Sequence, residues 1–176
     1  DGTVLRRHPN LFPQGLRSVA PVPVQGDHRA WVWRNEDDGR TSTLLLVDAE
    51  AATLRAVPVT GFDDRASAKS VRLAACADAS AWAAVKDCTT GPATDCLVRI
   101  GADGQVRATV PSTRGNHLVA DRDCGLTFLD ETAGAYRRIA ADGTPAWSDD
   151  RIELTQHNVV VGPDGDAWYS VETPSM

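Results

Sequence analysis

The chain has 176 residues, of which 42% are hydrophobic and 24% charged, and this is enough for one domain with a hydrophobic core. Its formal net charge of −6, and the lack of a basic cluster interleaved with aromatic residues, argue against a nucleic-acid-binding surface. No apolar run approaches the ~18 residues that a transmembrane helix needs, so we expect no membrane span.

In chain order, the first signal is the turn dipeptide Asp1-Gly2, followed by the strand-like segment TVLRRH. Beyond it, short apolar segments alternate with Gly, Pro, Asp and Asn at intervals of roughly eight to twelve residues, and no sustained helical periodicity is present. This pattern predicts an all-β protein. The segment DGTVLRRHPN aligns with DGQVRATVPS at 103–112, so residues 1–9 are interpreted as the outermost strand of a preceding repeat.

One motif, in which a turn leads into a strand with an aromatic residue, recurs four times. The copies are GDHRAWVW (26–33), ADASAWAAV (77–85), RDCGLTFL (122–129) and PDGDAWYSV (163–171). They align Asp27, Asp78, Asp123 and Asp164, and with them Trp31, Trp82, Thr127 and Trp168. The spacings of roughly 40 to 50 residues are those of β-propeller blades, in which each four-stranded sheet covers its neighbour.

We expect four antiparallel strands per blade, named a to d in chain order. They are predicted at 17–25, 30–35, 42–48 and 53–59; at 70–76, 81–87, 96–101 and 105–110; at 116–121, 126–130, 135–140 and 144–148; and, for a and b alone, at 157–162 and 167–172. The blade repeats span roughly 16–60, 68–111, 115–149 and 156–176. The prediction is therefore an all-β propeller segment, with about three complete blades and a partial blade at each end. The remainder of a larger ring is expected from another segment or chain.

The stretch VVVGPDGDAWYSVE (159–172) resembles the GPDGNLW strand–turn–strand segment of the streptogramin-lyase, NHL and SMP-30-like propellers. The resemblance is at the level of the fold. In such propellers strand a of each blade lines the central channel. The resemblance implies that a histidine at the start of strand a would be the natural general base of an enzyme of this kind.

The four cysteines form no C-x-x-C pair, so no structural zinc site is expected. Cys88 and Cys96 flank one b–c hairpin, and a disulfide between them would staple that loop. Cys76 and Cys124 fall near the a–b turns of neighbouring blades, and a second disulfide between them would cross the blade interface. Two disulfides would indicate an oxidising compartment, and hence a secreted or cell-surface protein; four buried free thiols are the alternative. The excess of Arg over Lys indicates a GC-rich, actinobacterial type of coding bias.

The a–b and c–d turns are short and define a bottom face, whereas the longer b–c and d–a connections define a top face. Long connections on one face of a rigid scaffold are where binding is usually located. The candidate ligand-binding residues on the top face are Asn116, His117, His157, Asn158, Asp63, Asp64, Asp149 and Asp150. His117 and His157 begin neighbouring a strands and are also candidate catalytic groups. Hydrogen-bonded structural histidines and solvated acidic loops are the alternatives.

We find no nucleophile elbow, P-loop, dinucleotide fingerprint or zinc-protease motif. The leading hypothesis is an extracytoplasmic binding module that engages a glycan or protein through its top face. The alternatives are an enzyme of the lyase or lactonase kind with a His base or metal ligand, and an assembly hub. No cofactor is expected, although the carboxylates of the DRD (121–123) and DGD (164–166) turns are compatible with binding of a divalent cation. The turn aspartates are otherwise expected to bond the main chain two residues on.

Overall fold

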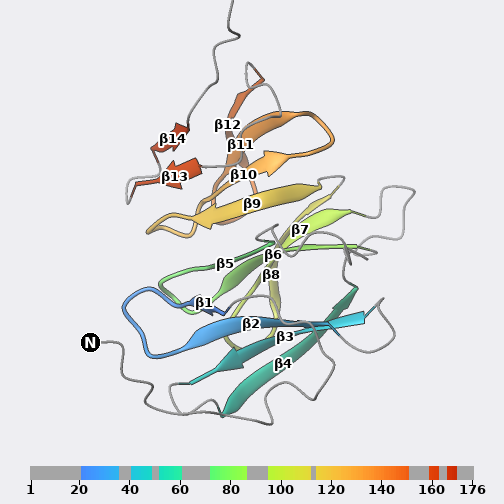
Figure 1. Ribbon diagram of the computed structural model, residues 1–176, viewed down its shortest axis with the longest axis vertical. Helices are drawn as coiled ribbons and strands as arrows, with labels where there is room; N and C mark the ends of the chain where they lie inside the picture. Colours follow the sequence, from blue (N-terminus) through green and yellow to red (C-terminus); the bar gives the residue numbers. More distant parts are fainter. Residues whose placement is uncertain are drawn as a thin grey trace, which may run out of the picture.

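The computed structural model describes residues 21–35, 41–48, 52–60, 72–86, 95–111, 114–150, 159–162 and 166–169. All the elements in these ranges are β-strands (Figure 1). Sheet 1 contains β1 (Val22–Pro23), β2 (Ala30–Asn35), β3 (Thr41–Val47) and β4 (Thr53–Thr60). Sheet 2 contains β5 (Leu73–Ala75), β6 (Ala81–Val85), β7 (Cys96–Ile100) and β8 (Val106–Pro111). Sheet 3 contains β9 (Gly115–Ala120), β10 (Leu126–Asp130), β11 (Ala135–Ile139) and β12 (Pro145–Asp149), and β13 (Val159–Val161) pairs with β14 (Ala167–Tyr169) in sheet 4.

The predicted fold class is confirmed: the chain is all-β, with three four-stranded antiparallel sheets in a blade-like arrangement. Within each sheet the strands follow one another in chain order, as in a simple meander. Strands a to d of the three complete repeats correspond to β1–β4, β5–β8 and β9–β12, and sheet 4 corresponds to strands a and b of the fourth. The outer strand expected within residues 1–9 lies outside the described residues, and the larger ring stays a prediction.

The three complete sheets are stacked on one another, with their first strands adjacent (Figure 1). β5 contacts β1 on one side and β9 on the other, and β9 in turn contacts β13. Among the described strands, the substantial contacts between different sheets all involve one of these first strands. The sheets therefore share an inner line of a strands, which is the geometry of propeller blades around an axis.

Side-chain alternation in β6 gives sheet 2 two apolar faces. Ala81, Ala83 and Val85 join a core with sheet 1, whereas Trp82 and Ala84 join a second core with sheet 3. All five residues of β6 are buried because a sheet covers each face. The small alanines leave space for the large side chains of the opposite sheet, among which Trp31 is fully buried.

Four hairpin turns share one backbone design, in which the fourth residue is left-handed. The first residue of each turn donates its N–H to the carbonyl four residues later, as from Cys76 to Ser80 and from Gly101 to Gln105. This is a tight turn followed by a residue with positive φ. The left-handed residues are Ala79 (φ 63°), Cys124 (φ 63°), Gly104 (φ 82°) and Gly143 (φ 89°). In sheets 2 and 3 the c–d turns thus use glycine, while the a–b turns keep a side chain despite the steric cost.

A tryptophan hydrogen bond joins each of the first two sheets to the next. The indole Nε1–H of Trp31 donates to the carbonyl of Ala79 at 3.0 Å, and that of Trp82 donates to the carbonyl of Cys124 at 2.9 Å. Both acceptors are the left-handed residues of the next a–b turn. Because Trp31 and Trp82 are 0% exposed, these bonds satisfy donors that water does not reach. In sheet 3 the equivalent residue, Thr127, is also buried.

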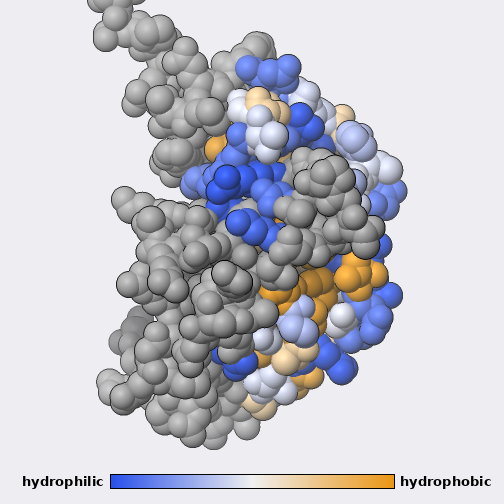
Figure 2. Space-filling model, turned by 90° about the vertical axis from the view of Figure 1, so that its right-hand side faces the viewer, coloured by the Kyte–Doolittle hydropathy of each residue, from blue (hydrophilic) through white to orange (hydrophobic). Residues whose placement is uncertain are grey.

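The described surface is largely polar. On the face shown in Figure 2, a group of hydrophobic residues comes to the surface among polar residues, which make up most of the coloured part of this view. The large hydrophobic residues exposed in the described part of the chain are Leu54, Val106 and Trp168.

Removing the indole donor at a sheet interface should destabilise the protein. We expect Trp82→Phe to lower the free energy of unfolding by about 1–3 kcal/mol, because it leaves the Cys124 carbonyl unpaired and creates a small cavity. Urea unfolding followed by circular dichroism measures this change. Trp168→Phe is the matched control, because this tryptophan is exposed, and should change the stability by less than about 0.5 kcal/mol. Equal effects for the two variants would contradict the role of the buried indole.

Candidate functional site

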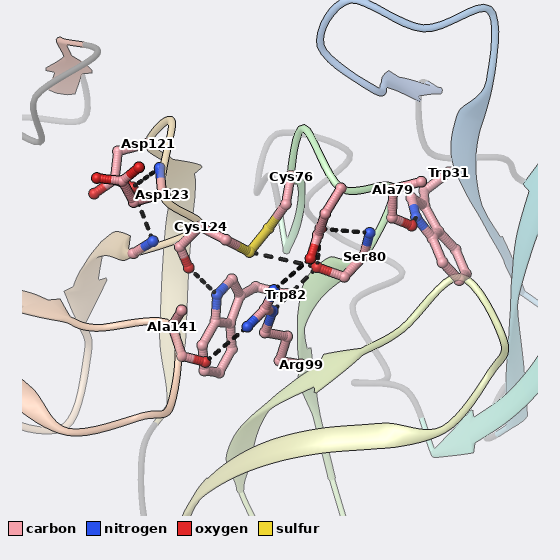
Figure 3. The surroundings of a disulfide bond; sticks show 12 residues. Trp31, Cys76, Ala79, Ser80, Trp82, Arg99, Asp121, Asp123, Cys124 and Ala141 are labelled. Atoms are coloured by element: carbon pink, nitrogen blue, oxygen red, sulfur yellow. Dashed lines mark hydrogen bonds and ion pairs between the residues drawn. A yellow bond between two sulfur atoms is a disulfide. The ribbon is translucent and has the colours of Figure 1, made fainter.

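A disulfide on the bottom face joins sheet 2 to sheet 3 (Figure 3). Cys76, the first residue of one a–b turn, is bonded to Cys124, the left-handed residue of the next, and their Cα atoms are 5.2 Å apart. Both residues are buried. This pairing was predicted from the sequence and is confirmed. Cys96 is also disulfide-bonded; its expected partner, Cys88, lies outside the described residues.

The disulfide occupies positions that are apolar at the preceding interface. Val24 begins the a–b turn of sheet 1 as Cys76 begins that of sheet 2, and Ala79 is the left-handed counterpart of Cys124. Val24 and Ala79 are buried in the core between sheets 1 and 2. The same site is thus filled by hydrophobic packing at one interface and by a covalent bond at the next.

Arg99 connects the turns on this bottom face. Its Nη2 lies 2.6 Å from Asp78 Oδ2, its Nε donates to Ser80 Oγ at 3.0 Å, and its Nη1 donates to the carbonyl of Ala141 in sheet 3 at 3.2 Å (Figure 3). Arg138, the equivalent residue of sheet 3, forms an ion pair with Asp121. The bottom face is therefore held by charge pairs as well as by the disulfide.

The turn aspartates cap main-chain groups, as expected for Asp78. Its Oδ1 accepts from the N–H of Ser80 at 2.9 Å and from the Ser80 hydroxyl at 2.5 Å. Partial burial raises the pKa of Asp78, but the Ser80 hydrogen bonds and the Arg99 charge outweigh this and hold its pKa below the ordinary value of 3.8. In sheet 3 the prediction that Asp123 caps the turn is wrong. Asp121 does so instead, and its Oδ1 accepts from the N–H of Asp123 at 2.9 Å and from that of Gly125 at 2.8 Å.

These residues do not fit a metal site in the disulfide form. Cys76, Asp78 and Cys124 place three possible ligand atoms within 4.8 Å of one another. The two sulfurs are bonded to each other, so neither is a thiolate, which is the form that binds a metal. In the DRD turn, Asp121 is already occupied by two N–H groups and Arg138. The DGD turn falls largely outside the described residues.

The top end of sheet 3 has a different character, because β9 contains a bulge at His117. Thr127 pairs with Val119 and Leu129 pairs with Asn116, so two residues of β9 lie opposite Phe128 alone. His117 has a φ of 50°, and its N–H is bonded to Asn116 Oδ1 at 2.8 Å. A non-glycine residue in this conformation is uncommon, and bulges often lie at sites that position a side chain.

A group of polar side chains surrounds this bulge; we call Arg114, Asn116, His117 and Glu131 the bulge cluster. Asn116 Nδ2 donates to Glu131 Oε1 at 2.8 Å, and Arg114 Nε lies 2.8 Å from Glu131 Oε2. The Glu131 N–H also donates to the carbonyl of Arg114 at 2.9 Å. The Arg114 and Glu131 side chains remain 44% and 28% exposed, so their polar atoms are within reach of solvent.

Sequence reasoning identified Asn116 and His117 but missed Arg114 and Glu131. The antiparallel pairing of β9 with β10 places Gly115 opposite Asp130, and this register brings the flanking residues Arg114 and Glu131 together. The hairpin motif was visible in the sequence, but its register depends on the bulge. The bulge in turn depends on a left-handed residue that the sequence does not mark with glycine.

The acidic pair Asp149 and Asp150 does not join the bulge cluster. Asp149 ends β12 opposite Tyr136, at the same top end as Asn116. The strand order β12-β11-β10-β9 nevertheless puts them at opposite edges of the sheet, about 14 Å apart from three strand spacings. Asp63, Asp64, His157 and Asn158 lie outside the described residues. β13 contacts β9, so their strands are neighbours as expected, but the position of His157 and Asn158 relative to Asn116 and His117 stays a prediction.

No protein-family model matches this sequence, and no curated protein shows significant similarity to it. In the part of the chain that the structure describes, no helix has the length and apolarity to cross a membrane.

Removing the disulfide should destabilise the protein even when the side-chain packing at its two positions is kept. The double variant Cys76→Val with Cys124→Ala reproduces the residue types of the preceding interface, so it should retain the packing and lose the link. Closure of a loop with a sequence separation of 48 residues predicts a loss of about 4 kcal/mol in the free energy of unfolding. Thermal and urea denaturation under non-reducing conditions measure it. Unchanged stability would show that the disulfide constrains little.

The ion pair of Asp78 with Arg99 should contribute to stability only while the Asp78 carboxyl is ionised. Its pKa is lowered on folding, so the contribution is present above 3.8 and lost as the pH falls below that value. At pH 6, Asp78→Asn should cost less than about 1 kcal/mol, since this pair is partly solvent-exposed, and the difference should shrink as the pH falls below 3.8. Asp123→Asn is the matched control and should behave like the wild type. A pH-independent cost for Asp78→Asn would contradict the argument.

Proposed function

We propose that this chain is a binding module of an extracytoplasmic protein, and that the bulge cluster on its top face contacts the ligand. The observation that carries the proposal is the left-handed His117. For a residue with a Cβ this conformation costs about 1–2 kcal/mol, and such strain is concentrated at functional sites. Asn116 holds the strained backbone in place through its side-chain hydrogen bond.

The chemistry of the bulge cluster favours a glycan as the ligand. Arg114 supplies N–H donors, Glu131 supplies carboxylate acceptors, and the amide of Asn116 has both kinds of group. Sugar hydroxyls donate and accept, so they can pair with this mixture of fixed, planar groups. The cluster combines an arginine with a carboxylate, and this balance of charge favours a neutral polyhydroxyl ligand over a strongly charged one.

The position of the cluster supports the same function. The bottom turns are tied by the disulfide and by Arg99, so they form a rigid base, whereas the bulge cluster lies at the opposite end of sheet 3. A disulfide of this kind supports an oxidising location, and we propose that the protein is secreted or exposed at the cell surface. We likewise retain the resemblance to streptogramin-lyase, NHL and SMP-30-like propellers as a proposal about the fold.

A glycan array probed with the wild-type chain tests this function, with His117→Asn as the decisive variant. Asparagine tolerates a positive φ, so the variant should fold normally and lose only the imidazole. We expect at least a tenfold weaker signal for the glycans that bind, and no change for Asp142→Asn, an exposed turn residue on the bottom face. Absence of any glycan signal, or binding indifferent to His117→Asn, would overturn the proposal.

The strained His117 also supports a second candidate, an enzyme of the lyase or lactonase kind in which the imidazole acts as general base. Incubation with a panel of lactones separates this candidate from binding alone. Product formation by the wild type that is abolished in His117→Ala would favour the enzyme. Glycan binding without turnover would favour the binding module.

A further inference from the structure

The disulfide between sheets 2 and 3 lies beside a carboxylate. Cys76, Asp78 and Cys124 each contribute one sulfur or oxygen atom to a group whose members lie within 4.8 Å of one another. While the two sulfurs are bonded to each other, they cannot bind a metal ion. Reduction of the bond converts the same two atoms into thiols, and the group then has the donors of a metal site.

Contacts other than the disulfide keep the two turns together. The indole of Trp82 in sheet 2 donates to the carbonyl of Cys124 in sheet 3 at 2.9 Å. Arg99, also in sheet 2, donates to the carbonyl of Ala141 in sheet 3 at 3.2 Å. Both cysteines are buried in an apolar core that the two sheets share. We therefore expect Cys76 and Cys124 to stay close to each other when the bond between them is broken.

Two thiolates and one carboxylate form a donor set that suits zinc. Thiolates select Zn²⁺ over Ca²⁺ and Mg²⁺, and three protein ligands with one water complete a tetrahedron. Zn–S bonds of about 2.3 Å and Zn–O bonds of about 2.0–2.2 Å put neighbouring ligand atoms about 3.6–3.8 Å apart. The three atoms here already lie within 4.8 Å, so side-chain rotation can enclose an ion once the sulfurs separate. The Asp78 side chain is 56% exposed, which leaves a path for the ion and the water.

The residues around this group balance its charge and hold its ligands. Two thiolates and a carboxylate carry three negative charges, and Zn²⁺ neutralises two of them. The guanidinium of Arg99, 2.6 Å from Asp78 Oδ2, supplies the remaining positive charge. Ser80 Oγ lies 3.4 Å from Cys124 Sγ and 2.5 Å from Asp78 Oδ1, so one hydroxyl contacts two of the three ligands (Figure 3). Such hydrogen bonds orient the ligands of a metal ion.

We propose that the chain with this disulfide reduced binds one Zn²⁺ ion through Cys76, Asp78 and Cys124. A dithiol reductant supplies the two electrons: the bond between the cysteine sulfurs breaks, the reductant closes its own disulfide, and its two protons pass to the cysteine thiols. Binding of Zn²⁺ then releases these two protons, one from each thiol. The ion replaces the covalent link between sheets 2 and 3, and this site is separate from the bulge cluster.

A titration with Co²⁺ tests the site, because Co²⁺ bound to thiolates has a charge-transfer band that is absent from the free ion. The whole chain carries Cys88→Ser and Cys96→Ser, so that the other two cysteines provide no thiolate. It is reduced with dithiothreitol and desalted under nitrogen. We expect one Co²⁺ per chain, displaced by one equivalent of Zn²⁺. The oxidised form of the same protein is the matched control and should bind none. No binding by the reduced chain, or equal binding by both forms, would rule out the site.

Further substitutions in the same background identify the ligands. Cys76→Ser should lower the intensity of the charge-transfer band per bound Co²⁺ about twofold, since one thiolate remains. Asp78→Asn should keep that intensity and raise the dissociation constant at least tenfold. Asp142→Asn, in an exposed turn, should change neither quantity. Unchanged affinity in Asp78→Asn would show that the carboxylate is not a ligand and would contradict the proposed site.

Circular dichroism shows whether the folded chain binds the ion. The reduced, metal-free protein should keep its β-sheet signal, and Zn²⁺ should raise its melting temperature, because the ion binds the folded state. If reduction alone unfolds the chain, Zn²⁺ should restore the signal by linking the two sheets. An ion that neither raises the melting temperature nor restores the fold would refute the proposal.

Discussion

The hydrogen bond from a buried indole to a left-handed carbonyl is the interaction on which the stacking of the sheets depends. Trp31 and Trp82 each bring a polar N–H into an apolar interface, where an unpaired donor would be costly. The acceptor is the carbonyl of Ala79 or Cys124, aimed by the turn of the next sheet. The indole therefore has to fit against the small residues opposite and still reach the turn carbonyl of the next sheet. This requirement fixes the spacing between sheets.

The same turns explain why the two ends of the sheets differ. At the bottom, residues in the left-handed conformation provide a carbonyl for an indole and, at Cys124, a sulfur for the disulfide. Arg99 adds contacts to its own turn and to the next sheet. At the top of sheet 3, the left-handed residue is His117, and its neighbours pair through half-buried polar groups. Backbone strain thus supports cohesion at one end and leaves polar chemistry accessible at the other.

Much of the fold followed from periodicity, and most of the site did not. Apolar alternation and turn residues located the strands, because a pleated strand buries alternate side chains whatever its neighbours are. Aligning the repeats also placed Cys76 and Cys124 at one interface, where they are bonded. Arg99 and Glu131 carried no such signal. Their partners lie in other turns or across a hairpin, so their roles depend on register and on the packing of sheets.

By itself, the sequence determined the strand order, the blade-like repeat and one covalent link, since these depend on local propensity and on the spacing of equivalent residues. Tertiary structure alone decided the bulge at His117, the carbonyls that accept the indoles and the separation of Asp149 from Asn116. The physical reason is that left-handed conformations of Ala, Cys and His are imposed by surrounding contacts rather than preferred by the residues. Only the packed sheets provide those contacts.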